Sequence, residues 1–168
     1  SGRLLVGSNQ ALGFGPLTVN GPGAASLGNV FLTNVVLTNE IILGKDLSIG
    51  SPTGSLRING QALGRPDIDL GSATRTLTVT GSVEFDGRVG GTGGLTKAGA
   101  GTLTLGVSND YSGPTTVNGG TLTLANPNGS ATGSGNVVIN NGGTVALSGD
   151  GKSDAALITI NAGGTLNV

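Results

Sequence analysis

The stretch GGTGGLTKAGAGTLTL (residues 90–105) and the stretch YSGPTTVNGGTLTL (residues 111–124) after it decide the fold of this chain. Both contain runs in which an apolar residue alternates with Thr, such as the two copies of LTL at residues 103–105 and 122–124. Alternation with a period of two is typical of a strand with one buried face, and the glycine pairs between the runs mark tight bends. These residues therefore predict strands of about three to five residues and no helix.

The bend before each of these strands has a repeated sequence. Asn-Gly-Gly-Thr occurs at residues 118–121 and 141–144, and it returns at residues 161–165 with one Ala inserted. Asn and Gly adopt left-handed backbone conformations at the least cost, so each copy is expected to turn the chain at the same point of a cycle. Among these glycines, Gly119 and Gly142 are expected to hold positive φ. The structural turn residues predicted in this way are Asn118, Gly119, Gly120, Asn141, Gly142, Gly143, Gly163 and Gly164.

The spacing of these bends predicts a solenoid. The glycine pairs step from Gly120 to Gly143 and then to Gly164, which is 23 and then 21 residues. A period in the low twenties is the signature of a solenoid with one coil per repeat. We expect roughly seven coils, in a rod on the order of 35 Å long at the spacing of parallel strands. An antiparallel β-sandwich is the alternative, because Asn-Gly between short strands is also a hairpin signal, but a sandwich gives no reason for the period.

The composition agrees with a narrow coil and excludes several classes of function. Gly supplies 34 residues, whereas one Tyr and three Phe are the only aromatic residues, and a coil filled by Val, Leu and Ile has no room for aromatic bulk. The absence of Cys excludes a disulfide framework and a thiolate metal site, and the absence of His excludes Ser-His-Asp catalysis. A net charge of -1 leaves no basic patch for nucleic acid. No apolar run approaches the roughly 18 to 20 residues of a membrane span.

No cofactor and no metal ion is expected. A calcium-binding solenoid carries a recurring Asp in its turns, but the turns here carry Asn, Gly and Thr. The run GGTGG at residues 90–94 invites a phosphate-loop interpretation. However, no helix is predicted after it, and Lys97 lacks the Ser/Thr partner that such a loop requires. We therefore interpret this run as a turn.

The same residues resemble a known family. The order GTGGLTKAGAGTLTL (residues 91–105) followed by NDYSGPTTVNGGTLTL (residues 109–124) resembles the passenger-associated transport repeat, also called the autotransporter-associated β-strand repeat, of bacterial autotransporter passenger domains. Looser matches extend over most of the chain. The resemblance implies a right-handed parallel β-helix, located outside the cell or on the bacterial cell surface in association with the outer membrane. It also implies a spacer that supports secretion and folding of the passenger.

Further segments are expected to complete the coils. The Pro- and Gly-containing stretches at residues 51–54 and 64–66 are expected to leave the coil as loops, so that a side chain at Gly54 should cost less stability than one at Gly119 or Gly142. Separate strands are predicted from alternating apolar residues at 47–49, 56–58, 68–70, 77–79 and 83–85.

Residues 30–43 are the most apolar stretch of the chain. Asn29, Asn34 and Asn39 recur there at five-residue steps, which favours strand, corner and strand within one coil. For the core we expect one ladder of inward-facing side chains, formed by Leu103, Leu122, Val145 and Leu166.

Four carboxylates are the candidates for catalysis. Asp67 with Asp69, and Glu84 with Asp86, lie two residues apart, so each pair shares one face of a strand. Enzymes that cleave polysaccharide use such pairs as acid and base. The simpler interpretation is that both pairs decorate a solvated face, because the chain has a single Tyr and no His with which to hold a sugar. We therefore expect no enzyme.

Two classes of function remain. The favoured one is a non-catalytic extracellular scaffold over residues 1–168 that gives rigid extension, display or adhesion; the alternative is a fragment of a carbohydrate-active enzyme that uses the four carboxylates. Both ends of the sequence read as strands without a polar cap. We therefore expect an internal piece of a longer solenoid, partnered by flanking coils of the same chain, or a subunit whose copies stack end to end as a fibre. The sequence does not identify the surface ligand that such a scaffold could bind.

Overall fold

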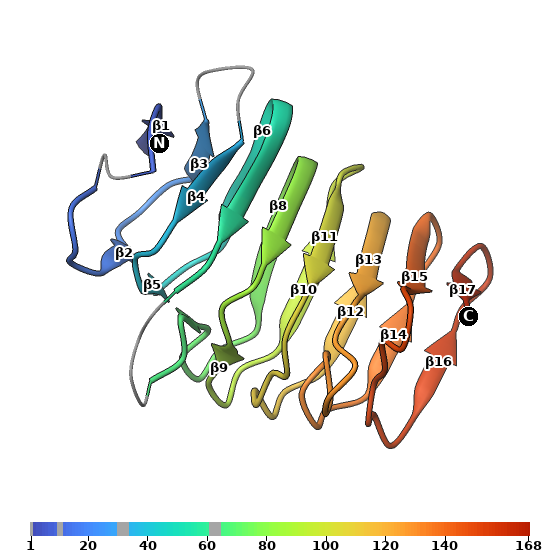
Figure 1. Ribbon diagram of the computed structural model, residues 1–168. Helices are drawn as coiled ribbons and strands as arrows, with labels where there is room; N and C mark the ends of the chain where they lie inside the picture. The colour runs from blue at the N-terminus through green and yellow to red at the C-terminus, as the bar shows by residue number, and fades with distance from the viewer. Residues whose placement is uncertain (1, 10–11, 30–33, 61–64) are drawn as a thin grey trace.

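The computed structural model describes residues 2–9, 12–29, 34–60 and 65–168. Every regular element in these residues is a β-strand, and the chain winds into a parallel β-solenoid of about seven turns. Figure 1 shows the coils side by side, from the blue N-terminal end to the red C-terminal end. The predicted all-β solenoid is confirmed.

Most strands are short, as the alternating runs predict. In chain order they are β1 (Gly2–Val6), β2 (Leu17–Val19), β3 (Ala25–Asn29), β4 (Val35–Leu37), β5 (Ile41–Leu43), β6 (Leu47–Ile58), β7 (Ile68–Asp69), β8 (Arg75–Phe85), β9 (Val89–Gly90), β10 (Leu95–Ala98), β11 (Thr102–Leu105), β12 (Thr115–Val117), β13 (Gly120–Leu124), β14 (Val137–Ile139), β15 (Gly143–Leu147), β16 (Ile158–Ile160) and β17 (Thr165–Asn167).

The strands stack along three sides of the coil. On the first side, β1, β3, the start of β6, the start of β8, β10, β12, β14 and β16 pair in that order. On the second side the order is β4, the end of β6, the end of β8, β11, β13, β15 and β17. The third side contains the sheet β2-β5-β7-β9. All of these pairs are parallel, which excludes the antiparallel sandwich.

The core lies inside the coils, where side chains stack in columns. Leu103 is paired with Leu122, Leu122 with Val145, and Val145 with Leu166, so the predicted ladder is confirmed. The first three of these side chains are at most 1% exposed. The intervening Thr residues point outward because successive side chains of a strand alternate between its two faces.

Two aromatic residues also lie in this core, contrary to the expectation that the coil has no room for them. Tyr111 is 0% and Phe85 is 2% exposed. Tyr111 lies on the third side beyond β9, where neighbouring coils are joined by backbone hydrogen bonds without regular strands, such as Asn109 N to Ser130 O at 2.8 Å. The coil is therefore wide enough at this side to enclose a phenol ring.

The predicted loop at residues 51–54 is wrong, because β6 runs through it as one strand. The pairing of β6 with β8 shifts between Gly50 and Ser55, so four residues of β6 lie opposite Gly81 alone and form a bulge. Gly54 holds φ of 94° in this bulge, whereas Gly119 holds no positive φ, so the expectation that a side chain costs less at Gly54 than at Gly119 is also wrong. Pro and Gly are signals shared by loops and bulges, and the sequence pattern does not separate the two.

The other loop and the asparagine corners are described in part. Residue 64 of the predicted loop at residues 64–66, residues 30–33 of the apolar stretch and the Asn29 side chain lie outside the described residues. Asn39 lies in the corner between β4 and β5, as predicted, and its Nδ2 donates to the carbonyl oxygen of Gly15 at 2.6 Å.

The position of the left-handed glycine varies between coils. Gly142 holds φ of 79° as expected, but Gly119 holds no positive φ, and Gly120 takes that role with φ of 61°. Two residues, 118 and 119, separate the first-side strand from Gly120, whereas three residues, 140–142, separate it from Gly143 in the next coil. In the shorter corner the residue with positive φ is therefore the second glycine of the Asn-Gly-Gly sequence, whereas in the longer corner it is the first.

Candidate functional site

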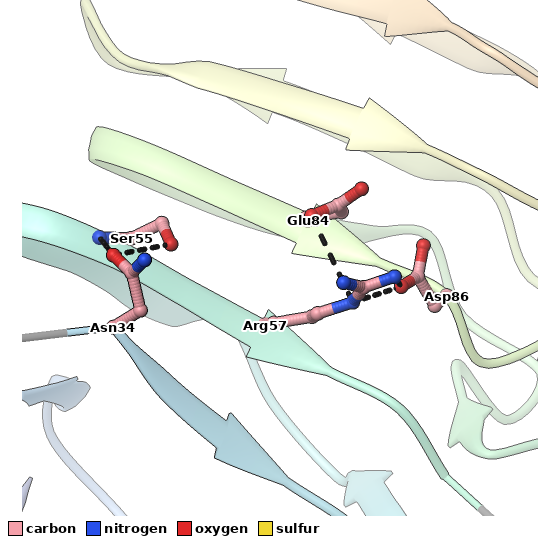
Figure 2. A network of polar contacts seen from close by, with 5 residues as sticks. All are labelled: Asn34, Ser55, Arg57, Glu84 and Asp86. Carbon is pink, nitrogen blue, oxygen red and sulfur yellow. Dashed lines mark hydrogen bonds and ion pairs between the residues drawn. The ribbon is translucent and has the colours of Figure 1, made fainter.

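Glu84 and Asp86 share a single arginine. Glu84 lies on the outer face of β8, directly opposite Arg57 of β6 in the parallel register. The Nε atom of Arg57 is 3.8 Å from Oε2 of Glu84, and the guanidinium also donates to Oδ2 of Asp86. Figure 2 shows both carboxylates turned toward this guanidinium. The pair is therefore bound to the protein's own cation.

A second polar contact lies beside this group on the same outer face. Oδ1 of Asn34 accepts hydrogen bonds from the backbone nitrogen of Ser55 at 3.1 Å and from its hydroxyl at 3.0 Å (Figure 2). This contact joins the coil of β4 to the coil of β6. The outer polar groups here link one coil to the next.

Asp67 and Asp69 accept hydrogen bonds from backbone amides on the third side. Oδ2 of Asp67 accepts a hydrogen bond from the backbone nitrogen of Arg88 at 2.8 Å, and the Asp67 residue is only 9% exposed. Oδ1 of Asp69 accepts one from the nitrogen of Gly71 at 2.8 Å, as in an Asx turn. The guanidinium of Arg88 is paired with Asp110.

The four carboxylates do not form an acid and base pair over a common substrate. A glycosidase needs two carboxyl groups that face one sugar, one of them able to carry a proton. Here two carboxylates face Arg57 and the other two accept backbone amides. In addition, no group of three or more potential metal ligands occurs in the described parts of the chain.

Two shallow hollows lie on the outer face of the first side. Their volumes are about 490 Å³ and 320 Å³, and Ser48 lines both. The larger one is bordered by Lys45 and Asp46, and the smaller one by Arg3. None of the four candidate carboxylates lines either hollow.

Lys97 is the residue whose position the sequence reasoning missed. It occupies an inward-facing position in β10 between Leu77 and Val117 of the neighbouring coils, and it is 0% exposed. Its Nζ donates to the carbonyl oxygens of Ala98 at 3.3 Å, Gly99 at 2.9 Å and Gly119 at 2.8 Å. Burial lowers the pKa of Lys97 to about 8.

The sequence did contain a signal for this burial. In the run LTKA of β10, Lys97 stands in the same phase as the buried Leu95, so the alternation alone places it inside. A charged residue at an inward position is uncommon, so the residue type and the alternation predict opposite faces for Lys97. The structure instead uses the ammonium group to join two corners.

Tyr111 makes the second buried polar contact in the same repeat. Its hydroxyl lies 2.7 Å from Oγ1 of Thr115, and both residues are fully buried. Burial raises the pKa of the Tyr111 phenol, and the hydrogen bond with Thr115 opposes that shift only in part. The phenol is therefore neutral in the folded protein.

Three asparagines at successive corners form an exposed ladder of side-chain hydrogen bonds. The ladder contains Asn118, which is one of the predicted turn residues, but it contains Asn140 in place of the predicted Asn141. Nδ2 of Asn140 donates to Oδ1 of Asn118 at 2.7 Å, and Nδ2 of Asn161 donates to Oδ1 of Asn140 at 2.6 Å. The register aligns Asn118 with Asn140, although the Asn-Gly-Gly pattern pairs it with Asn141. The extra corner residue in the later coil accounts for this offset.

No helix in the described ranges has the length and apolarity needed to cross a membrane.

Comparisons with known proteins point to one kind of protein. The family model described as passenger-associated-transport-repeat matches residues 95–124. Over 158 aligned residues the chain is 32% identical to a protein described as adhesin BmaC autotransporter, from Brucella suis biovar 1 (strain 1330). The match covers 82% of this chain and 5% of that protein, so the chain spans only a small part of its relative's length. No solved structure matches the chain.

Proposed function

Because this chain is an autotransporter passenger repeat segment with a passenger-associated-transport repeat at residues 95–124, we propose that it is a non-catalytic scaffold of a secreted or cell-surface protein. Its stacked coils give the passenger rigid extension. They hold whatever the rest of the protein displays at a distance from the cell surface. Folding of one coil on another also supports the emergence of the passenger outside the outer membrane.

The observation that carries this proposal is the unbroken parallel register of the second side. The column that contains Val83, Leu103, Leu122, Val145 and Leu166 runs through five successive coils without a shift. Each coil contacts its two neighbours along the whole column, so the stack resists bending, and its stability is a sum of interfaces between neighbouring coils.

The state of the carboxylates supports a role without catalysis. Glu84 and Asp86 bind Arg57, and Asp67 accepts a backbone hydrogen bond while nearly buried. A general acid must reach its substrate and keep a proton available. Side chains bound in this way stabilise the fold. This argues against the alternative hypothesis, a fragment of a carbohydrate-active enzyme, because that hypothesis depends on these carboxylates.

Adhesion is a second candidate function. It is favoured by one observation, the description of the 32% identical relative as an adhesin. In that role the outer faces would bind a target directly, and the rod would be part of the binding surface. The Thr residues at 102, 121, 144 and 165, which follow one another across the second side, give this face a regular row of hydroxyl groups.

Two assays test the proposal. Release of reducing ends from a panel of neutral and acidic polysaccharides is measured for the 168-residue protein and for the Glu84→Gln and Asp67→Asn variants. We expect no release above background from any of the three; release that either substitution abolishes would establish an enzyme. Antibody labelling of intact bacteria that produce the parent protein tests the location, and labelling only after permeabilisation would contradict it.

A further inference from the structure

Asn128 and Gly129 lie in a turn between β13 and β14, with a neighbouring coil on each side. The carbonyl oxygen of Ser130 accepts a hydrogen bond from the nitrogen of Asn109 in the coil before, at 2.8 Å. The hydroxyl of Ser130 accepts one from the nitrogen of Asp154 in the coil after, at 3.1 Å. Asn128 is exposed in this setting. Its exposure therefore belongs to the turn itself and does not come from an end of the stack.

The backbone of this turn is held in place, whereas the Asn128 side chain is not. Asn126 is 4% exposed, and its Oδ1 accepts a hydrogen bond from the nitrogen of Asn128 at 3.1 Å. Its Nδ2 donates to the carbonyl oxygens of Asn128 at 2.6 Å and Gly129 at 3.2 Å. Within the ranges that the structure describes, neither the Asn128 side-chain amide nor the Gly129 nitrogen makes a hydrogen bond. The two groups that react with each other at an Asn-Gly step are thus both free.

Two other Asn-Gly steps in the same half of the chain are held by the next coil. Oδ1 of Asn118 accepts a hydrogen bond from Nδ2 of Asn140 at 2.7 Å. After Asn141, the nitrogen of Gly142 donates to the carbonyl oxygen of Gly163 at 3.1 Å. In one step the electrophile is engaged, and in the other the nucleophile is engaged.

The remaining two Asn-Gly steps lie in the N-terminal half of the chain. Oδ1 of Asn20 occupies the place that a Cβ on Gly44 of the next coil would take, so this side chain is packed against a neighbour. Asn59 is half-buried, and residues 61–64 after Gly60 lie outside the described ranges. Asn128 therefore differs from Asn20, Asn118 and Asn141 in having no such restraint on its reactive groups.

We propose that Asn128 is a self-modification site, at which the nitrogen of Gly129 attacks the asparagine side chain and converts it to aspartate or isoaspartate. A bond forms between this nitrogen and Cγ of Asn128, while the bond from Cγ to Nδ2 breaks. Nδ2 takes up the proton of the Gly129 nitrogen and leaves as ammonia. Water then opens the succinimide ring at either of its two carbonyl carbons. Glycine favours the attack because it has no Cβ to hinder the approach.

The turn can also accommodate the products. Both products add a negative charge at position 128, because a carboxylate replaces an amide. In isoaspartate this carboxylate contains the former carbonyl oxygen of Asn128, which accepts hydrogen bonds from Nδ2 of Asn126 and from the hydroxyl of Ser108. Hydrogen bonds to a charged acceptor are stronger than those to a neutral one. The donors that hold the turn are therefore already directed at the oxygen that becomes charged.

The test compares three Asn-Gly steps within one peptide. Asn118, Asn128 and Asn141 lie between Lys97 and Lys152 with no other Lys or Arg between them, so trypsin releases them together. The folded protein is aged in mildly alkaline buffer and digested, and fragment mass spectrometry measures the conversion at each asparagine. We expect Asn128 to convert roughly fivefold faster or more than the other two, which is about the effect of one hydrogen bond. Ageing in concentrated urea should make the three rates similar.

Asn140→Ala is the matched control variant. It removes the donor to Oδ1 of Asn118, so it should raise the rate at Asn118 and leave the rate at Asn128 unchanged. Circular dichroism establishes that the variant and the aged protein keep their β-structure. Equal rates at the three steps in the folded protein would overturn the proposal. An Asn128 that stays intact in the folded protein while it converts in urea would overturn it as well.

Discussion

Nζ of Lys97 donates a hydrogen bond to the carbonyl oxygen of Gly119 at 2.8 Å, across the boundary between two neighbouring coils. The same ammonium group donates to Gly99 at 2.9 Å within its own corner. A charge buried between Leu77 and Val117 is costly unless such partners satisfy it. The centre of the repeat is thus held by one buried cation whose charge depends on pH.

We expect the stability of the protein to rise between about pH 8 and pH 10 because of Lys97. Burial lowers the pKa of this amine from 10.5 to about 8. Between these values the unfolded chain still binds a proton that the folded chain has released, so the free energy of unfolding increases with pH. The gain is about 2 kcal/mol over this range.

Urea titrations across that pH range measure the effect, with Lys97→Met as the control. The variant should lack the rise, whatever its stability at neutral pH. A flat profile in the unchanged protein would show that the three carbonyl oxygens keep the ammonium charged in the fold.

Above about pH 10 the direction should reverse because of Tyr111. Burial raises the pKa of this phenol, so the stability that the neutral ring confers is fully present below its ordinary pKa of 10.0 and is lost as the pH rises above it. Tyr111→Phe should remove the decline and should cost about 1 kcal/mol at neutral pH, because the hydrogen bond with Thr115 is lost. Tyrosinate absorbance during an alkaline titration reports the same event, and ionisation near pH 10 without unfolding would contradict it.

The turn glycines offer a matched pair of substitutions. Gly142 holds φ of 79° with no atom within 4 Å of an added Cβ, and Gly119 holds no positive φ, with its nearest such contact at 3.5 Å. Gly142→Ala should therefore cost about 1–2 kcal/mol from backbone strain alone, while Gly119→Ala should be nearly neutral. The denaturant midpoints of the two variants measure these costs in stability. Equal costs would contradict the corner geometry.

Sequence reasoning predicted the columns of the solenoid well but predicted the corners less well. The LTL runs and the step from Gly120 to Gly143 define which residues face inward, because alternation and period are properties of the strands themselves. Whether a corner has two residues or three depends on where the previous strand ends. For this reason the sequence pattern predicts the left-handed residue at Gly119 and aligns Asn118 with Asn141, whereas the structure has Gly120 and Asn140 in these places.

The candidate site was predictable only in its composition. The spacing in the sequence identifies the four carboxylates, but it does not predict their partners. Arg57 is 27 residues from Glu84 in sequence and reaches it only because the bulge in β6 sets the register of the two strands. The burial of Lys97 is not predictable from residue type, because a buried charge contradicts the usual preference of Lys for solvent.

The inward ladder should carry much of the stability of the repeat. Leu122 is 0% exposed between Leu103 and Val145, so Leu122→Ala leaves a cavity and should cost roughly 2–5 kcal/mol. Thr123→Ala, on the outer face of the same strand, should cost less than 1 kcal/mol, on the order of the effect of a surface substitution. Urea titration of both variants gives the comparison, and a neutral Leu122→Ala would show that the column is not the packed core.

The central claim is that the chain is a rigid stack of parallel coils, and a distance along the stack tests it most directly. The chain has no Cys, so Ser82→Cys and Thr165→Cys can be spin-labelled selectively, and both positions are exposed. Four register steps join them through Thr102, Thr121 and Thr144. Pulsed electron resonance should give one narrow distance distribution near 19 Å, at about 4.8 Å per step. A broad distribution, or one centred beyond about 30 Å, would contradict the rigid stack.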